Sequence, residues 1–288
     1  MKQKGLASLL FISLLLVLSA CGDSDNGNVS SSDQEKADGK WADIQESGKI
    51  VYGTAGTLYP ASYYPEDSDK LTGYNVEVMR EIAKRLNLDI KFETMAFDAM
   101  LASLKSGRID VITAGPREQS RKKFTFSEPF KHSYSTMIVR ADNLSGITTL
   151  EDLKGKKAGG AATTVYSDIA RKFGAKVKTY GNATNDVYLR DVANGRTDVI
   201  INDYYLQKLA LKAFPKLDIK IHPDLKFHST TVNVVMPKDS SKLEKKINQA
   251  LAEMHKDGTL TKLSKKFFAG EDVSKKPDEE IREIEGIE

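Results

Sequence analysis

A few polar side chains in this sequence are of types that can hold a small anionic group. Arg121 carries a planar guanidinium, which binds a carboxylate through two parallel hydrogen bonds. Thr163 and Thr164 stand directly before a predicted helix, whose free N-terminal N–H groups favour an anion. Each also has an ordinary structural interpretation, because Arg121 precedes two lysines of a surface run and a threonine before a helix caps it. The residue types therefore indicate anion binding without requiring it.

The sequence shows no pattern that indicates catalysis or a metal site. No Gly-x-Ser-x-Gly nucleophile motif is present, and the histidines lack metal-ligand spacing. These histidines are His132, His222, His228 and His255. The formal charge is only +3, with lysines and arginines spread along the chain, so nucleic-acid binding is disfavoured. We predict no metal and no cofactor, and we favour binding over catalysis.

The first residues are typical of an export signal. Lys2 and Lys4 precede an apolar run from 6 to 18, which is shorter than the roughly 20 residues of a spanning helix. Leu18-Ser19-Ala20-Cys21 resembles a bacterial lipobox, in which the cysteine thiol is lipidated. The alternative is an ordinary signal peptide with a chance cysteine. Cys21 is the only cysteine, so no disulfide forms within one chain. We predict a lipid anchor on Cys21 at the extracytoplasmic face of the cell membrane.

The remaining chain divides by composition. Residues 21–40 are small and polar and predict a flexible tether, and residues 271–288 predict a charged tail or frayed helix. About 230 residues remain between them, enough for two modest lobes.

Strands and helices alternate along this middle part. Apolar runs predict strands at 49–54, 89–92, 110–113, 157–160, 177–180, 198–202 and 231–236, and helical spacing predicts helices at 76–86, 97–104, 150–155, 165–173, 188–193 and 243–256. A motif of glycine, arginine, any residue and aspartate ends two successive units, at 107–110 and 195–198. The pattern indicates an α/β protein of two lobes with a ligand cleft between them.

The order of several strings resembles the solute-binding proteins for polar amino acids, family 3. The strings are Leu71-Thr72-Gly73-Tyr74-Asn75, Phe97-Asp98-Ala99-Met100-Leu101, Ser106-Gly107-Arg108-Ile109-Asp110, Arg121-Lys122-Lys123-Phe124-Thr125-Phe126-Ser127-Glu128-Pro129-Phe130 and Lys256-Asp257-Gly258-Thr259-Leu260. The resemblance runs from about Lys49 to Phe268. It implies a two-lobed periplasmic-binding-protein type II fold with a hinge and an interlobe cleft. Lobe 1 would comprise 41–140 and 230–270, and lobe 2 would comprise 141–229, with crossings near Val139-Arg140 and Thr231-Val232.

The resemblance also implies a site for a zwitterion. Arg121 would bind the ligand carboxylate, Asp203 would accept the α-ammonium, and Thr163 and Thr164 would add contacts from lobe 2. The side chains of Phe97 and Tyr59 would pack on the ligand, and Ala114 and Gly115 would contribute backbone contacts. Asp203 can alternatively start a turn, and Phe97 can alternatively belong to the core.

One loop departs from the family pattern. The segment from Ala114 to Arg121 is one residue short, and it carries charge where hydroxyls are expected. Arg117 in this loop either points into the cleft, where it would favour a carboxylate-rich ligand, or is a solvated loop residue.

The implied role is capture of a polar amino acid for an ABC importer by a monomer that docks on a permease and its ATPase. The strings Gly53-Thr54-Ala55-Gly56-Thr57 and Thr163-Thr164-Val165-Tyr166-Ser167 resemble the cystine-binding branch most. Two alternatives stay open. One is an enzyme of the same fold, similar to cyclohexadienyl or arogenate dehydratases, for which Glu118 is the candidate acid. The other is a ligand-sensing domain.

Overall fold

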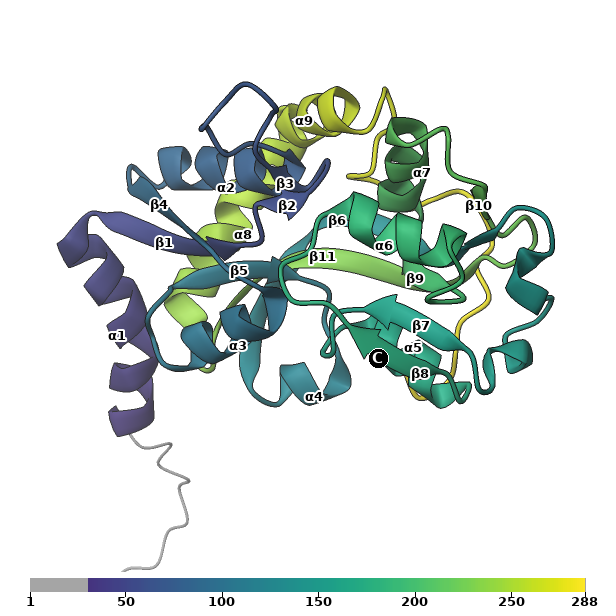
Figure 1. Cartoon of the computed structure of the whole chain (residues 1–288). Helices are drawn as coiled ribbons and strands as arrows, with labels where there is room; N and C mark the ends of the chain where they lie inside the picture. Colours follow the sequence, from purple (N-terminus) through teal and green to yellow (C-terminus); the bar gives the residue numbers. More distant parts are fainter. Residues whose placement is uncertain (1–30, 288) are drawn as a thin grey trace, which may run out of the picture.

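The computed structural model describes residues 31–287, with side chains from residue 39 onward, and it has two lobes (Figure 1). The predicted α/β class is confirmed, because helices cover a mixed sheet in each lobe. The predicted signal peptide and Cys21 lie outside the described residues. Within those residues, no helix is long and apolar enough to cross a membrane.

Lobe 1 is built on five neighbouring strands in the order β4 (Asp89–Thr94), β1 (Lys49–Thr54), β5 (Val111–Ala114), β11 (Phe227–Pro237) and β6 (Phe124–Arg140). The strands β4, β1 and β5 are parallel, and β11 runs antiparallel to β5. On one face, α1 (Ser31–Ser47), α2 (Tyr74–Arg85), α8 (Ser241–Lys256) and α9 (Thr259–Phe267) contribute to one apolar cluster. On the other face, α3 (Phe97–Lys105) packs Met100 and Leu104 against Ile112. The short strands β2 (Thr57–Leu58) and β3 (Ser62–Tyr63) form a hairpin at one edge.

Lobe 2 uses the second half of β6, which pairs with β9 (Ile200–Asp203) and β10 (Ile219–Ile221). A parallel pair, β7 (Lys157–Gly160) and β8 (Lys176–Thr179), joins through a bridge between Ala158 and Val199. One face of this sheet is covered by α5 (Val165–Lys172), and the other by α6 (Asn185–Ala193) and α7 (Tyr204–Ala213). The predicted helix at 150–155 is a short 3-10 helix, Glu151–Leu153.

Two long antiparallel strands, β6 and β11, cross between the lobes. Phe130 of β6 packs in the lobe 1 cluster, whereas Met137 and Val139 pack in the lobe 2 cluster. This strand therefore changes lobes several residues before the crossing predicted near Val139-Arg140. In β11, Phe227 packs in lobe 2 and Val234 in lobe 1, and the predicted crossing lies between them.

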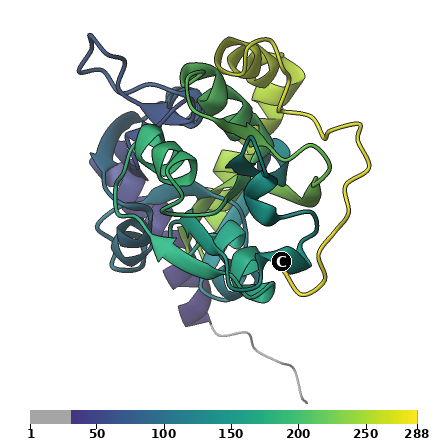
Figure 2. The ribbon, with the colours of Figure 1, turned by 45° about the vertical axis from the view of Figure 1, so that its right-hand side comes forward.

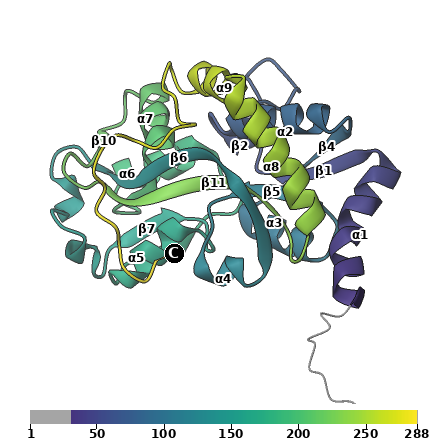
Figure 3. The ribbon, with the colours of Figure 1, turned by 180° about the vertical axis from the view of Figure 1, so that it is seen from behind.

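Residues 271–287 form an extended segment that spans both lobes, which we call the C-terminal strap (Figures 2 and 3). It leaves α9 with Val273 buried in lobe 1, and it ends with Ile284 buried in lobe 2. Beside β11, the His228 N–H donates to the Arg282 carbonyl at 2.8 Å. The ε-ammonium of Lys172 on α5 donates to the Glu285 carbonyl at 2.5 Å. The segment predicted as a tail is thus held along its length, and the second half of the predicted tether is part of α1.

The repeated Gly-Arg-x-Asp motif has the same local role in both lobes. In lobe 1, Asp110 Oδ2 accepts the Val51 N–H of β1 at 2.8 Å, and the Asp110 N–H donates back to the Val51 carbonyl at 2.9 Å. In lobe 2, Asp198 forms the same pair with Lys157 of β7, at 2.9 and 2.8 Å. Gly107 and Gly195 take φ values of 77° and 69°, which favour glycine, and end the preceding helices. In each lobe, the glycine of the motif ends a helix, and the aspartate bonds the following segment to the neighbouring strand, β1 or β7.

We expect Asp110→Ala to lower the free energy of unfolding by about 1–3 kcal/mol, because it leaves the partly buried Val51 N–H without an acceptor. Urea denaturation followed by circular dichroism measures the change. The matched control is Asp69→Ala in the exposed loop after β3, for which we expect no measurable loss. An Asp110→Ala protein as stable as wild type would contradict the structural role of the motif.

Candidate functional site

A cavity of about 880 Å³ lies between the lobes, and both crossing strands and the end of the strap contribute to its walls. All the residues predicted to contact a ligand line it: Tyr59, Phe97, Ala114, Gly115, Arg121, Thr163, Thr164 and Asp203. The structure thus brings together side chains that lie far apart in the sequence. Their contact with a ligand stays a prediction.

The lobe 1 wall combines backbone and aromatic surface at the carboxyl ends of β1 and β5. Gly115 follows β5 where the chain runs close to β11, and a Cβ on it would lie 2.9 Å from the Thr231 carbonyl oxygen. Only glycine fits this approach, which keeps the backbone of Ala114 and Gly115 on the cavity wall. Phe97 both lines the cavity and packs against the lobe 1 core, so its two predicted roles coexist. Tyr59 is 39% exposed and packs edge-on against Tyr63.

The two arginines of the short loop are in different environments. Arg121, the last residue of α4 (Glu118–Arg121), is exposed, and its guanidinium lies 5.8 Å from the centre of the Phe126 ring. No carboxylate among the described residues pairs with it. Arg117 caps α4, and its side chain is only 16% exposed because it reaches across to lobe 2. The loop therefore directs one arginine to the opposite lobe and leaves the other available at the cavity edge.

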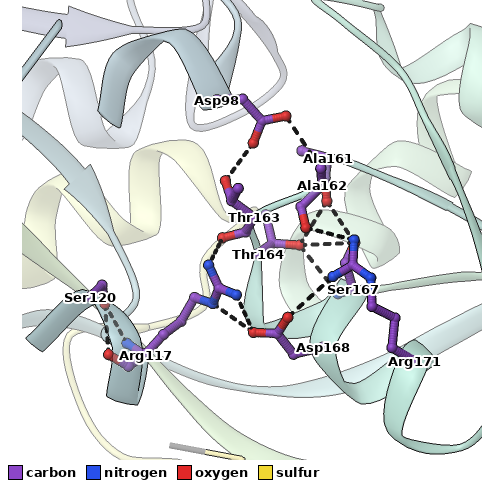
Figure 4. A network of polar contacts seen from close by, with 10 residues as sticks. All are labelled: Asp98, Arg117, Ser120, Ala161, Ala162, Thr163, Thr164, Ser167, Asp168 and Arg171. Atoms are coloured by element: carbon purple, nitrogen blue, oxygen red, sulfur yellow. Dashed lines mark hydrogen bonds and ion pairs between the residues drawn. The ribbon is translucent and has the colours of Figure 1, made fainter. Parts of the chain in front are cut away.

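Arg117 is the centre of a polar network that joins the lobes (Figure 4). Its Nε donates to Asp168 Oδ2 at 2.7 Å, a second guanidinium nitrogen pairs with the same carboxylate, and its Nη1 donates to the Thr163 carbonyl at 2.5 Å. Asp168 lies in the first turn of α5 and also accepts from Arg171 at 3.2 Å. Charge-assisted hydrogen bonds of this kind are stronger than neutral ones. The arrangement holds the start of α5 against the shortened loop.

Thr163 and Thr164, two residues of the predicted site, lie next to the network around Arg117. The Thr163 hydroxyl donates to Asp98 on α3, and Asp98 also accepts the Ala162 N–H at 3.4 Å (Figure 4). Thr164 is the N-cap of α5, because its hydroxyl accepts the Ser167 N–H at 3.3 Å. The capping interpretation of Thr164 is therefore confirmed.

A second set of contacts joins the lobes elsewhere around the cavity. The Thr57 hydroxyl donates to Asn182 Oδ1 at 3.1 Å, and the Asn185 side-chain amide donates to the Tyr59 carbonyl at 3.1 Å. With the pair of Arg117 and Asp168, these contacts bring the lobes together at more than one place around the cavity.

Asp203, the predicted ammonium acceptor, is already bonded within the protein. It caps α7, where its Oδ1 accepts the Leu206 N–H at 3.0 Å. Its Oδ2 pairs with the ammonium of Lys131 on β6, and both residues are 2% exposed. Sequence reasoning missed Lys131, because β6 contains many other polar residues and no local signal distinguishes this lysine.

Asn75 and Gln207 line the cavity, and the amide oxygen of each is buried and has no donor among the described residues. Asn75 donates its amide to Thr113 at 3.1 Å, and Gln207 donates to the Ile200 carbonyl at 2.8 Å, which leaves Asn75 Oδ1 and Gln207 Oε1 without partners. A buried acceptor without a donor favours a ligand that supplies one. Burial, with a smaller effect of the Asp98 carboxylate, raises the pKa of Tyr188 on the lobe 2 wall, so its hydroxyl stays neutral.

The cavity therefore offers a guanidinium, backbone from the carboxyl ends of two strands, and uncharged acceptors. This combination binds a small solute that carries both an anionic group and hydrogen-bond donors. Among residues 39–287, no three His, Cys, Asp or Glu side chains are arranged to hold a metal ion.

Comparison with known proteins matches residues 50–270 to the bacterial extracellular solute-binding proteins, family 3. The chain is 52% identical to the probable ABC transporter extracellular-binding protein YckB of Bacillus subtilis, over 99% of this chain and 98% of that protein. It is 35% identical to the L-cystine-binding protein TcyA of the same organism, over 95% of this chain and 100% of that protein. The crystal structure of YckB superposes with a TM-score of 0.67, at 57% identity, and covers 85% of this chain and 99% of that structure.

We expect Arg117→Met to separate the lobes, because it removes the charge-assisted contacts to Asp168 and Thr163. Such bonds contribute about 1–2 kcal/mol at a partly exposed position, so the population with separated lobes should rise roughly 5–30-fold. Small-angle X-ray scattering measures this as a larger radius of gyration. Arg108→Met is the matched control, since Arg108 pairs only with Glu93 inside lobe 1. An unchanged scattering curve for Arg117→Met would show that the pair does not hold the lobes together.

Proposed function

Because the chain belongs to the bacterial extracellular solute-binding proteins of family 3, we propose that it is the substrate-binding component of an ABC importer for a polar amino acid. It captures the amino acid between its lobes and delivers it to a membrane permease and its ATPase, without chemical change. The observation that carries this proposal is the interlobe cavity, where Arg121, without a carboxylate partner among the described residues, faces the same space as Asn75 and Gln207.

The proposed roles follow from the charges of a zwitterion. Arg121 binds the α-carboxylate, because a guanidinium presents two parallel donors and Arg117 is already engaged with Asp168. Asn75 and Gln207 accept from the α-ammonium, together with Asp203.

The remaining proposed contacts hold the rest of the ligand. Phe97 and Tyr59 pack on the ligand side chain, and Ala114, Gly115, Thr163 and Thr164 contribute contacts from the two walls. Because groups from both lobes are needed, the ligand favours the arrangement in which the lobes are together.

L-cystine is the ligand we propose. Two observations support it: one relative with 35% identity is named an L-cystine-binding protein, and the cavity of about 880 Å³ suits a solute larger than a single ordinary amino acid. Cystine carries two carboxylates and two ammonium groups, so the second half needs polar partners as well. Thr57, Asn182 and Asn185, which line the same cavity, supply them in this proposal.

We further propose that the protein acts as a monomer attached to the outer face of the cell membrane through a lipid on Cys21. The support is the short apolar run that ends at Leu18-Ser19-Ala20-Cys21. A tether between this anchor and lobe 1 would let the lobes reach the permease.

A thermal-shift screen of protein lacking residues 1–21 tests the class and the ligand together. At about 100 times its Kd, a ligand stabilises the folded state by about 2.7 kcal/mol, which raises Tm by roughly 5–10 °C for a chain of this size. We expect this rise with L-cystine and none with glycine. A rise with a different amino acid would correct the ligand and keep the class, and no rise with any amino acid would contradict the proposed function.

Substitution of Arg121 tests its proposed role. Arg121→Ala should weaken L-cystine binding in calorimetry by about 1.5–3 kcal/mol, which is roughly tenfold to over a hundredfold in Kd. Lys122→Ala, an exposed neighbour that pairs with Glu118, is the matched control and should keep the wild-type Kd. If Arg121→Ala binds normally while Arg117→Ala does not, the carboxylate contact belongs to Arg117.

A further inference from the structure

The ion pair between Lys131 and Asp203 is the most deeply buried pair of opposite charges at the cavity. The lysine ammonium comes from β6, where this strand passes between the lobes, and the carboxylate comes from the end of β9 in lobe 2. Each residue is 2% exposed, and both line the cavity. The pair is therefore shielded from solvent and in contact with the space proposed for the ligand.

Lys131 is fixed in this position by its surroundings. Its ammonium lies 5.9 Å from the centre of the Tyr205 ring and 5.6 Å from that of Phe268, so aromatic faces surround the charge. The position of Asp203 is also fixed, because its second carboxylate oxygen caps α7 by accepting the Leu206 N–H. Both carboxylate oxygens thus have a donor from the protein.

Other acids on the cavity wall do not replace Asp203. The cavity is also lined by Glu283 and Glu285 of the strap. Glu283 accepts the Ser229 N–H at 3.1 Å and pairs with His228 at 3.4 Å. Of these three acids, Asp203 is the fully buried one, and its charge is balanced by an ammonium group of the same chemistry as that of an amino acid.

We propose that Lys131 is a specificity-determining residue, which competes with the ligand's α-ammonium for Asp203; this rests on the proposed function. The Lys131 ammonium belongs to the same chain as Asp203, so its effective concentration at the carboxylate is high. The binding free energy that a ligand ammonium gains from Asp203 is therefore only the difference between its own contact and the contact of Lys131 that it replaces. The α-ammonium is then bound largely by the uncharged oxygens of Asn75 and Gln207. Recognition depends mainly on the carboxylate, and the α-ammonium adds little affinity.

The test compares L-cystine with 3,3′-dithiodipropionate, which is the same disulfide without its two α-ammonium groups. The ratio of their Kd values, measured by calorimetry, isolates recognition of the ammonium. In Lys131→Met, Asp203 loses its internal partner, so the preference for L-cystine should increase by at least about tenfold relative to wild type. Addition of Asp203→Asn to Lys131→Met should return the ratio to near the wild-type value, which closes a double-mutant cycle.

Two further variants separate this role from a purely structural one. Lys131→Arg keeps the charge and should keep the wild-type ratio, and Lys131→Gln should raise it as Lys131→Met does, which provides a second neutral variant if the first folds poorly. Circular dichroism and Tm establish that each variant is folded. An unchanged ratio in a folded neutral variant would overturn the proposal, as would loss of L-cystine binding, since that would make Lys131 a ligand contact.

Wild-type binding separates failure of this inference from failure of the proposed function. If wild type binds L-cystine and the ratio does not respond to Lys131, only the inference fails. If wild type binds another amino acid instead, the same cycle is run with that amino acid and its α-deamino acid. If it binds no amino acid, the proposed function and this inference fail together.

Discussion

The long pairing of β6 with β11, which β-bulges interrupt at three places, is the constraint on which the rest of the structure depends. Each strand begins in one hydrophobic core and ends in the other, and their hydrogen bonds to each other run through the region between. The two lobes are consequently joined by the backbone hydrogen bonds between these two strands. The cavity lies beside this ladder, so residues such as Lys131 and Thr231 form a wall that belongs to neither lobe alone.

Charge balance across the cavity explains how the lobes approach each other. Asp168 on α5 is matched by Arg117 from the opposite lobe, and Asp203 by Lys131 from the crossing strand. A charge that becomes buried without a partner is costly, so each lobe presents groups that the other can satisfy. Arg121 differs from them, because it remains at the cavity edge with an aromatic ring as its neighbour. Charges that have a partner within the protein thus position the lobes, whereas the charge of Arg121 stays available for a solute.

Local patterns in the sequence predicted the parts of the fold that local physics determines. Helical spacing gave the positions of α2, α3, α5 and α8, and a glycine with positive φ ended several of these helices as expected. The residues expected around the cleft do line one cavity, because most of them follow the carboxyl ends of strands or begin helices, whereas Arg121 ends α4. The pairing of Arg117 with Asp168 and of Lys131 with Asp203 joins positions 51 and 72 residues apart, and no local periodicity encodes such pairs. The packing of the strap could not be predicted from the sequence either, because its charged composition resembles that of a solvated tail. Its packing depends on isolated apolar residues such as Val273 and Ile284.

The strap places Ile287 on the lobe opposite to the first described helix. Trp41 of α1, the single tryptophan, is buried in the core of lobe 1, whereas the strap ends beside α5 in lobe 2. An acceptor dye attached beyond Ile287 would therefore be separated from this tryptophan by the cavity. Resonance energy transfer from Trp41 to that dye would follow the distance between the lobes in solution, with a natural donor.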